Sequence, residues 1–471
     1  MNAKQCEYRK ETDSIGVKDV PKEAYYGVQS LRAAENFRIT GLHIHPEMIR
    51  SMADIKEAAA LTNYENGELD EAIEKAVICA CREMKEGKFD EEIIVDPIQG
   101  GAGTSLNMNI NEVLANRAIE LLGGTKGDYT RVHPNDHVNK SQSTNDVFPT
   151  AGKITVLKLL QKTEKELRKL CNALDEKAKE FDPVIKMGRT ELQDAVPIRL
   201  GQEFAAYAAA VKRDTRRMEQ AMKEMQTVNL GGTAIGTGIN ASAGYIKKIV
   251  HNLELVTGLD LSQNEDLIDG TANLDSFVAV SGSVKACAAT LSKIASDLRL
   301  MSSGPRTGLG EIILPGKQNG SSIMPGKINP VIPEVVNQVA YHIFGNDVTV
   351  TAAAESGQLE LNAFEPVIFY NLFQEVDMLG YAASTFTDNC IVGIQADSAR
   401  CMELLNSSVG TVTAISPCVG YAKASEIAKK ALREKKSIRD LIQEENLMEG
   451  QDLDKVLDPY RMTEPEEYQR R

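Results

Sequence analysis

The chain has 471 residues, of which 42% are hydrophobic and 25% charged, a composition typical of globular rather than disordered or fibrous proteins. Its 67 acidic residues outnumber its 53 basic residues, which gives a formal net charge of −14 at pH 7. Because no basic excess can neutralise phosphates, we expect no nucleic-acid partner. Eight widely spaced cysteines and a charged N-terminus without an apolar signal-peptide core favour a cytoplasmic location, with free thiols and no membrane partner.

Long apolar stripes run through the middle of the chain. Apolar side chains recur at alternating spacings of three and four residues, or at every seventh residue, the pattern of helices that pack along their whole length in a bundle. The stripes occupy five segments: 160–181, 204–225, 277–301, 333–343 and 372–390. Segments of ~30 residues make helices of ~45 Å. We therefore expect a mainly α fold with a long bundle, and a homo-oligomer whose copies cover its sides.

The segments on either side of the stripes differ from them in composition. Residues 1–142 mix short helical patterns with loops and predict an N-terminal mixed helical domain. Residues 143–395 hold the stripes and predict a central long-helix bundle domain. Residues 396–471 form shorter, charge-rich helical patterns and predict a small C-terminal helical domain. The sequence therefore predicts three domains.

Four loop-like segments interrupt the helical patterns. Glycines precede a helix at 100–105, which leaves backbone N–H groups free to bind an anion. The segment 141–146, Ser-Gln-Ser-Thr-Asn-Asp, also precedes a helix, and N-capping is the simpler explanation when that segment is taken alone. The segment 188–194 lies between two heptad helices. The segment 320–330 combines Gly-Ser-Ser with Pro-Gly-Lys, typical of a mobile loop that brings a hydroxyl, a cation and an amide together.

The segment GSSIMPGKINP at 320–330 closely resembles the signature of the fumarase/aspartase superfamily. Further segments resemble the aspartases of that superfamily, in the same order and at matching intervals: VDPIQGGAGTSLNMNINEVLANRA, HPNDHVNKSQSTNDVFPTA, KMGRTELQDAVP and GNDVTVTAAAESGQLELNAFEPV. The resemblance covers nearly the whole chain. It implies a mainly α, three-domain fold and a homotetramer built on a shared core of long helices, with each site assembled from three subunits.

Class II fumarate hydratases (fumarases) are the alternative within this superfamily. Three details resemble aspartases instead: Glu191 stands where fumarases usually carry His, NPVIPEVVNQV stands where they have NPTQCE, and Thr144 stands where they typically have Ser. The aspartase resemblance implies reversible deamination of L-aspartate to fumarate and ammonia, by anti-elimination through an enediolate. A catalytically silent helical scaffold is a third alternative, and the intact set of site residues argues against it.

The resemblance also assigns roles to individual residues. Removing a proton from Cβ of aspartate creates a doubly charged β-carboxylate that the site must stabilise. By resemblance, Ser321 is the general base, Lys327 and Asn329 hold the α-carboxylate, and Glu334 lies behind the site and polarises a neighbour. Four hydroxyl residues bind the β-carboxylate: Thr104, Ser143, Thr144 and Ser322. Three residues lie near the leaving amine: Asn145, Thr190 and Glu191.

The role of Glu191 has an alternative. Its carboxylate can accept hydrogen bonds from a substrate ammonium, which suits an amine better than water. Glu191 also differs from the Gln or His of well-known aspartases. A structural ion pair with Arg189, or with a neighbouring helix, is therefore the other interpretation.

The sequence predicts no resident cofactor. His133 and His137 are four positions apart, but Pro134 lies between them, so we expect no helix and no metal-binding pair there. The implied chemistry requires neither a metal nor an organic cofactor, although activation by magnesium is compatible with it.

Overall fold

The computed structural model describes residues 7–448 and 450–465, and the chain divides into two compact units. Unit 1 comprises Met1–Glu164, Arg216–Ala286 and Tyr341–Leu379, and unit 2 comprises Lys165–Thr215, Cys287–Ala340 and Gly380–Arg471. Every boundary between the two falls inside a long helix, so each long helix supplies residues to both units. The three domains expected from the sequence remain a prediction.

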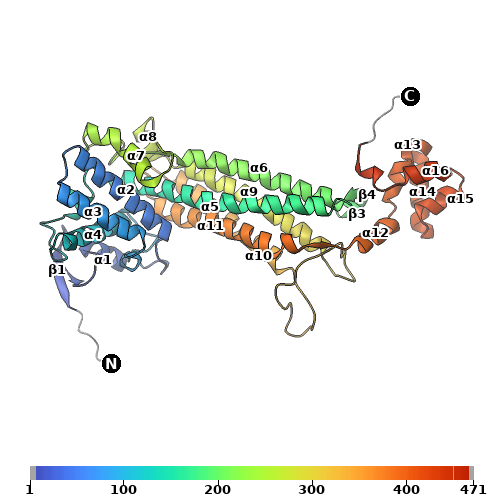
Figure 1. Ribbon diagram of the computed structural model, residues 1–471, viewed down its shortest axis with the longest axis horizontal. Helices are drawn as coiled ribbons and strands as arrows, with labels where there is room; N and C mark the ends of the chain where they lie inside the picture. Colours follow the sequence, from blue (N-terminus) through green and yellow to red (C-terminus); the bar gives the residue numbers. More distant parts are fainter. Residues whose placement is uncertain (1–6, 449, 466–471) are drawn as a thin grey trace. The chain divides into compact units, whose positions relative to one another are not determined.

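Five long helices occupy the segments where the sequence predicts apolar stripes (Figure 1). They are α5 (Thr144–Glu180), α6 (Leu200–Met225), α9 (Asp275–Met301), α10 (Val331–Glu355) and α11 (Glu365–Asn389). Their stripe residues are buried, as Leu167, Val211 and Leu298 illustrate with 0% exposure. Pro333 lies in the first turn of α10, where its missing N–H group has no helical partner to lose. The predicted long helices are therefore confirmed.

One helix, α9, is long and apolar enough by length and composition to cross a membrane. The core helix of a bundle passes the same test. The apolar side chains Phe277, Val284 and Leu291 of α9 are at most 1% exposed, so burial within the fold accounts for them.

Shorter elements complete unit 1. A hairpin of β1 (Tyr8–Thr12) and β2 (Val17–Pro21) precedes six helices, and a short parallel pair joins β5 (Thr227–Val228) to β6 (Ser262–Gln263). The helices are α1 (Val28–Asn36), α2 (Pro46–Glu65), α3 (Glu71–Lys85), α4 (Thr104–Leu121), α7 (Ala243–Thr257) and α8 (Leu267–Ala272). Helix α2 packs against α3, α4 and α7, and its Met52, Ile55 and Ala59 are fully buried. Unit 1 therefore has its core around α2.

Unit 2 contains a β-hairpin where the sequence suggested only a loop. Strands β3 (Ile185–Thr190) and β4 (Gln193–Arg199) pair antiparallel, and Glu191 and Leu192 form the two-residue turn with φ of 55° and 63°. Such turns normally take Asn-Gly or Asp-Gly, so the Glu-Leu pair carries no recognisable hairpin signal. The expectation of a loop at 188–194 is therefore corrected.

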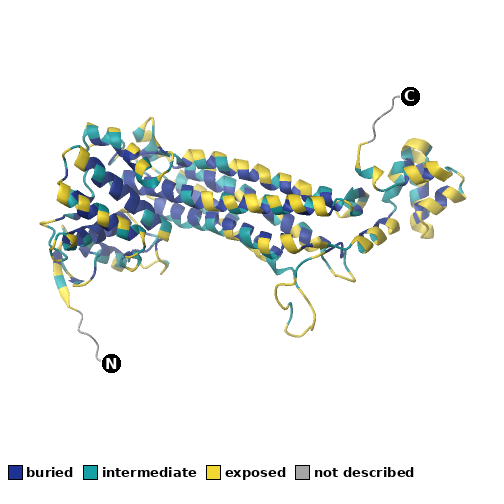
Figure 2. Cartoon of the chain, viewed as in Figure 1, coloured by how far each residue is buried: buried dark blue, intermediate teal, exposed yellow. Residues whose placement is uncertain are grey.

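The rest of unit 2 holds a short strand pair and the C-terminal helices. Strand β7 (Ile312–Ile313) pairs antiparallel with β8 (Gln395–Ala396). The helices that follow are α12 (Ser398–Ser407), α13 (Ser416–Val419), α14 (Tyr421–Glu434), α15 (Ile438–Glu444) and α16 (Gly450–Val456). Ile427, Leu441 and Ile442 form part of a separate small core there. The segment between β7 and α10 forms a long, mostly exposed loop (Figure 2).

Seven cysteines fall within the described residues, and none of these seven forms a disulfide there. Cys6 lies outside the described residues, as do the remaining positions of 1–6 and the tail at 466–471.

Candidate active site

Thr104 stands at the first position of α4, directly after a glycine-rich turn. Gly103 precedes it with φ of 86°, and a Cβ atom there would lie 2.4 Å from Cγ of Phe148. Only glycine combines this left-handed conformation with such a close approach. The exposed hydroxyl of Thr104 donates to the carbonyl of Gly101 at 2.8 Å. The turn therefore presents a hydroxyl at a helix N-terminus, which carries partial positive charge.

The second group of predicted residues lies where α5 begins. Asp146 is fully buried, and its carboxylate accepts N–H groups from Ser143 at 2.9 Å and from Gly231 and Thr233 at 3.0 Å each. These bonds join the turn before α5 to a distant turn at 229–233. Burial raises the pKa of Asp146 to about 6, against the lowering effect of its N–H donors and of Lys56. Asp146 therefore holds the backbone that presents Ser143.

Thr144 and Asn145 are oriented by separate partners. The Thr144 hydroxyl accepts from Nδ2 of Asn107 at 3.0 Å, and within the described chain its own hydrogen has no acceptor. Nδ2 of Asn145 donates to the carbonyl of Ala234 at 2.7 Å, which leaves its Oδ1 as an acceptor. Since Asn107 lies one turn after Thr104 on α4, it brings the starts of α4 and α5 together.

A buried lysine that the sequence reasoning missed supports this group. Lys56 of α2 is 0% exposed, and its Nζ donates to Oδ1 of Asn139 and Oε1 of Gln142, both at 2.9 Å. Oδ1 of Asn139 also accepts from Asn107 at 3.2 Å, so the contacts continue to Thr144. Burial lowers the pKa of Lys56 to about 7. The sequence offered no clear signal for it, because Lys56 stands between the charged residues Asp54 and Glu57.

In unit 2, Thr190 and Glu191 are exposed at the tip of the β3–β4 hairpin. The adjacent Arg189 donates from Nη1 to Oε1 of Glu311 at 2.8 Å, so it pairs with Glu311 rather than with Glu191. Within the described chain, the Glu191 carboxylate makes no hydrogen bond or ion pair. The structural ion pair considered for Glu191 is therefore not formed, and its carboxylate is available to a ligand.

The signature loop is organised by its own backbone. The N–H of Gly320 donates to the carbonyl of Lys327 at 2.8 Å, and Nδ2 of Asn329 donates to the carbonyl of Gly320 at 2.9 Å. The hydroxyl oxygen of Ser321 accepts two backbone N–H groups, from Ile323 at 3.2 Å and Met324 at 3.1 Å. The loop therefore holds Ser321 and Asn329 near one another, with two N–H dipoles aimed at the serine oxygen.

The remaining predicted residues of unit 2 flank that arrangement. Ser322 and Lys327 are exposed in the loop, and Glu334 lies in the first turn of α10. The predicted site residues thus form one group in unit 1 around the starts of α4 and α5, and two groups in unit 2, on the hairpin and on the loop.

The histidine segment folds differently from expectation. Residues Pro134–Val138 form a π-helical turn, so the expectation of no helix there is wrong. Nδ1 of His133 accepts the N–H groups of Asn135 and Asp136, and Nδ1 of His137 accepts the N–H of His133 at 2.8 Å. Both rings therefore cap the turn. Over residues 7–448 and 450–465, no cluster of three or more His, Cys, Asp or Glu side chains could hold a metal ion.

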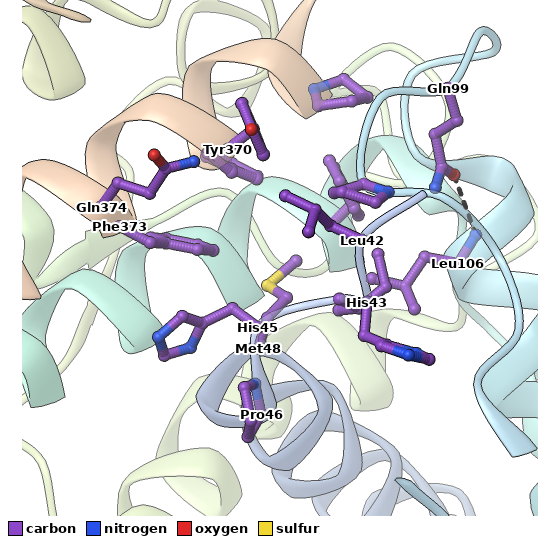
Figure 3. Close-up of a pocket in the computed structure, with 15 residues that line it drawn as sticks. Leu42, His43, His45, Pro46, Met48, Gln99, Leu106, Tyr370, Phe373 and Gln374 are labelled. Carbon is purple, nitrogen blue, oxygen red and sulfur yellow. Dashed lines mark hydrogen bonds between the residues drawn. The ribbon is translucent and has the colours of Figure 1, made fainter. Parts of the chain in front are cut away.

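Unit 1 also contains an apolar pocket of about 390 Å³ (Figure 3). Aliphatic and aromatic side chains such as Leu42, Met48 and Phe373 line it, and His45 at its edge pairs with Asp377 at 2.9 Å. No predicted site residue lines this pocket. Its apolar walls do not suit a dicarboxylate, so it is separate from the candidate site.

Comparison with known proteins identifies the class of this fold and site. Residues 16–345 match the family described as Lyase, and residues 412–464 match the family described as Fumarase C C-terminus. The chain belongs to this family of lyases, the fumarase/aspartase superfamily, and the predicted mainly α fold of that superfamily is confirmed. It is 51% identical to the aspartate ammonia-lyase of Bacillus subtilis, over 98% of this chain and 97% of that protein.

Other relatives and solved structures agree with this assignment. The aspartate ammonia-lyase of Helicobacter pylori is 49% identical over 98% of this chain and 99% of that protein. A crystal structure of a fumarate lyase:delta crystallin from Brucella melitensis, bound to cobalt, has a TM-score of 0.95 and 48% identity, covering 98% of this chain and 100% of that chain. A crystal structure of a class II fumarase from Schistosoma mansoni has a TM-score of 0.94 and 36% identity, covering 97% of this chain and 99% of that chain.

Proposed function

We propose that this chain is an aspartate ammonia-lyase that interconverts L-aspartate with fumarate and ammonia. The observation that carries the proposal is 51% identity with an aspartate ammonia-lyase over 98% of this chain. Class II fumarate hydratase is the second candidate, favoured by a nearly identical fold at the lower identity of 36%. The carboxylate of Glu191, exposed and without a partner in the described chain, is chemically suited to an ammonium group and so favours the first.

Ser321 is the base in this proposal. Its deprotonated oxygen takes the proton from Cβ of aspartate: the C–H bond breaks, the O–H bond of the serine hydroxyl forms, and the electron pair moves into an enediolate of the β-carboxylate. The enediolate then forms the carbon–carbon double bond as the C–N bond breaks and ammonia leaves. A serine hydroxyl is normally too weak a base, and the N–H groups of Ile323 and Met324 support its role because they favour the charged oxygen.

Hydroxyl groups stabilise the enediolate. Thr104, Ser143, Thr144 and Ser322 are the proposed donors to the β-carboxylate. Thr144 is well suited, because Asn107 occupies its acceptor side and leaves its hydrogen for a ligand. Below its pKa of about 7, Lys56 is a buried cation that contacts Asn139 and Gln142 behind these hydroxyl residues. One such donor is worth roughly 2.7–4 kcal/mol in comparable sites.

The other end of the substrate meets charged and amide groups. Lys327 and Asn329 are the proposed partners of the α-carboxylate, the lysine acting as a point charge. Asn145, Thr190 and Glu191 are the proposed neighbours of the amine. Oδ1 of Asn145 is available as an acceptor since its Nδ2 donates to Ala234. We assign Glu334 to a supporting position behind the loop.

We further propose a homotetramer in which each site takes residues from three copies of the chain. Helix α10 supports association, because Tyr341 and Val348, seven positions apart and so on one face of the helix, are 60% and 67% exposed. Between Glu334 and Glu355 the only charged residue of α10 is Asp347, which is buried. An uncharged helical face of this length is typical of an interface. Light scattering of the purified chain tests the proposal through its molar mass.

The decisive assay follows the absorbance of fumarate. L-aspartate and, separately, L-malate without ammonia are supplied to the purified protein before and after removal of metal ions with a chelator. We expect fumarate from aspartate and none from malate. Fumarate from malate alone would make the protein a hydratase and overturn the proposal. We also propose that the enzyme is cytoplasmic and needs no resident cofactor, so activity should survive the chelator, with added magnesium testing for activation.

A further inference from the structure

A buried cluster of charges lies behind the hairpin in unit 2. Glu311 is 0% exposed; its Oε1 accepts from Nη1 of Arg189 at 2.8 Å, and its Oε2 lies 3.1 Å from Nζ of Lys186. Lys186, 2% exposed, also donates to both carboxylate oxygens of Glu203 at 2.9 and 3.1 Å. Two cations and two carboxylates therefore balance one another, with Glu311 and Lys186 buried and with Arg189 and Glu203 partly exposed.

The hairpin is built to deliver both cations to Glu311. In a regular strand, Lys186 and Arg189 are an odd number of positions apart and would point to opposite faces. The β3–β4 register shifts between Met187 and Arg189. A Cβ atom at the intervening Gly188 would lie 2.7 Å from the carbonyl of Val196, so the irregularity requires glycine. The bulge thus turns Lys186 and Arg189 toward one carboxylate.

The backbone of Glu311 fixes the start of strand β7, from which the Ser321 loop leaves. Its N–H donates to the carbonyl of Met301, and its carbonyl accepts the N–H of Asp397, both at 2.9 Å. The next two residues are β7, which pairs with β8. The loop that carries Ser321 leaves directly from this fixed point. Glu311 therefore contacts strand β3, which ends at Thr190 just before Glu191, and it also begins the attachment of the Ser321 loop.

We propose that Glu311 is a positioning residue that joins the amine-side hairpin and the anchor of the Ser321 loop into one rigid assembly. The inference rests on the proposed function, because it concerns the geometry of that site. Glu311 lies behind the hairpin and acts through Arg189 and through the backbone. Nothing in the sequence marked it, since Lys186, Arg189 and Asp397 all lie far from it along the chain.

Removing the charge of Glu311 has two separate consequences. It leaves Lys186 with Glu203 as its remaining carboxylate partner and removes the carboxylate partner of Arg189, and an uncompensated buried charge is unfavourable. It also frees Arg189, the residue next to the hairpin tip. A displacement of about 1 Å in a positioned group costs ~10²-fold in rate. We therefore expect a loss of activity that accompanies a looser loop and hairpin.

The test compares three variants of the full-length protein. Glu311→Gln keeps the shape and removes the charge, while Glu311→Asp keeps the charge and is too short to reach both cations. Glu375→Gln is the matched control: Glu375 is also 0% exposed, lies in unit 1, and has its pKa raised by burial to about 8, so the amide mimics its neutral form. The first readout is kcat/KM for L-aspartate. The second is the rate of tryptic cleavage after Lys317 and Lys327, both exposed in the loop.

We expect Glu311→Gln to lose ~10²-fold in kcat/KM and to be cleaved faster in the loop, Glu311→Asp to fall between it and the wild type, and Glu375→Gln to match the wild type. If Glu311→Gln does not fold, Glu311→Asp carries the same comparison. A folded Glu311 variant with wild-type cleavage in the loop, or with kcat/KM within about threefold of wild type, overturns the proposal.

The failure of this inference is distinguishable from failure of the proposed function. A wild-type protein without activity on aspartate would refute the function, while the cleavage rates would still decide whether Glu311 anchors the loop. Equal losses in Glu311→Gln and Glu375→Gln would show a general effect of altering buried carboxylates and would refute the specific role of Glu311.

Discussion

The proposed site residues at the start of α5 in unit 1 are fixed more tightly by hydrogen bonds and burial than those in the Ser321 loop of unit 2. In unit 1, Thr144 is 9% exposed, its hydroxyl accepts from Asn107, and the adjacent Asp146 fixes two turns with three hydrogen bonds. In unit 2, the hydrogen bonds that Ser321 receives from residues 7–448 and 450–465 come only from the backbone of its own loop, in which Ile323 is 84% exposed. In unit 1 the start of α5 is fixed by buried partners, whereas in unit 2 the loop that carries Ser321 is mostly exposed.

This difference matches what each group does in the proposed reaction. Donors to a developing charge are most effective when they are fixed in place before the reaction, because no reorganisation is then required. A base that covers the substrate must let the substrate enter first, and loops provide such movement. The fold therefore places three of the proposed donors, Thr104, Ser143 and Thr144, at or just before helix N-termini, and it places the proposed base, together with Ser322, on an exposed loop.

The largest effect is expected from the exposed loop of unit 2. Ser321→Ala removes the proposed base, and turnover of L-aspartate should fall by at least ~10³-fold. Thermal unfolding should be unchanged, since the loop contributes little to the core. The Ser322→Ala variant serves as the control, with a smaller loss because Ser322 is one of several donors. Near-normal turnover in folded Ser321→Ala would show that another group is the base.

The next effect probes the fixed donors of unit 1. Thr144→Val keeps the shape of the side chain and removes the hydroxyl, so kcat should fall by roughly 10²–10³-fold. Thr144→Ser keeps the hydroxyl and should retain most of the activity. Steady-state rates with L-aspartate make the comparison. Equal activity of the Val and Ser variants would remove Thr144 from the site.

The rigidity of the unit 1 turn can be tested without any assay of activity. Gly103→Ala adds a methyl group at φ of 86° and against Phe148, and we expect a loss of about 1–3 kcal/mol in the free energy of unfolding. Gly282→Ala in α9 is the control, because a Cβ atom there meets nothing within 4 Å and alanine favours a helix. Denaturant unfolding of both variants measures the difference; equal stabilities would contradict the packing argument.

The smallest effect is expected from the buried side chain of Lys56. Burial lowers the pKa of Lys56 from 10.5 to about 7, so between these pH values the unfolded chain binds a proton that the folded chain does not. This contribution to folding stability therefore rises with pH across that window. Lys56→Met removes it, and the stability of the variant relative to wild type should decline as pH rises above 7. Urea unfolding from pH 6 to 10 measures this change, with the exposed Lys75→Met variant as the control. A stability difference that does not depend on pH would contradict the lowered pKa of Lys56.

The helices were predictable because their signal is local and repeated. Apolar residues at spacings of three and four marked all five long helices, and the signature segment marked the family. The hairpin at 185–199 was not predictable, since its turn uses Glu191 and Leu192 rather than the residues that usually signal such turns. The π-helical turn after His133 was missed for a related reason, because Pro134 at its start reads as a helix breaker.

The sequence by itself determined the helical architecture, the family and the identities of the proposed reacting groups. Periodicity acts over a few residues, and a signature is contiguous, so both are visible in one dimension. Tertiary structure alone decided which polar groups hold those residues in place. Asp146 reaches the N–H of Thr233 across 87 positions, and Arg189 reaches Glu311 across 122. Such contacts satisfy polar groups that burial has removed from water, and their partners are known only once the chain has folded.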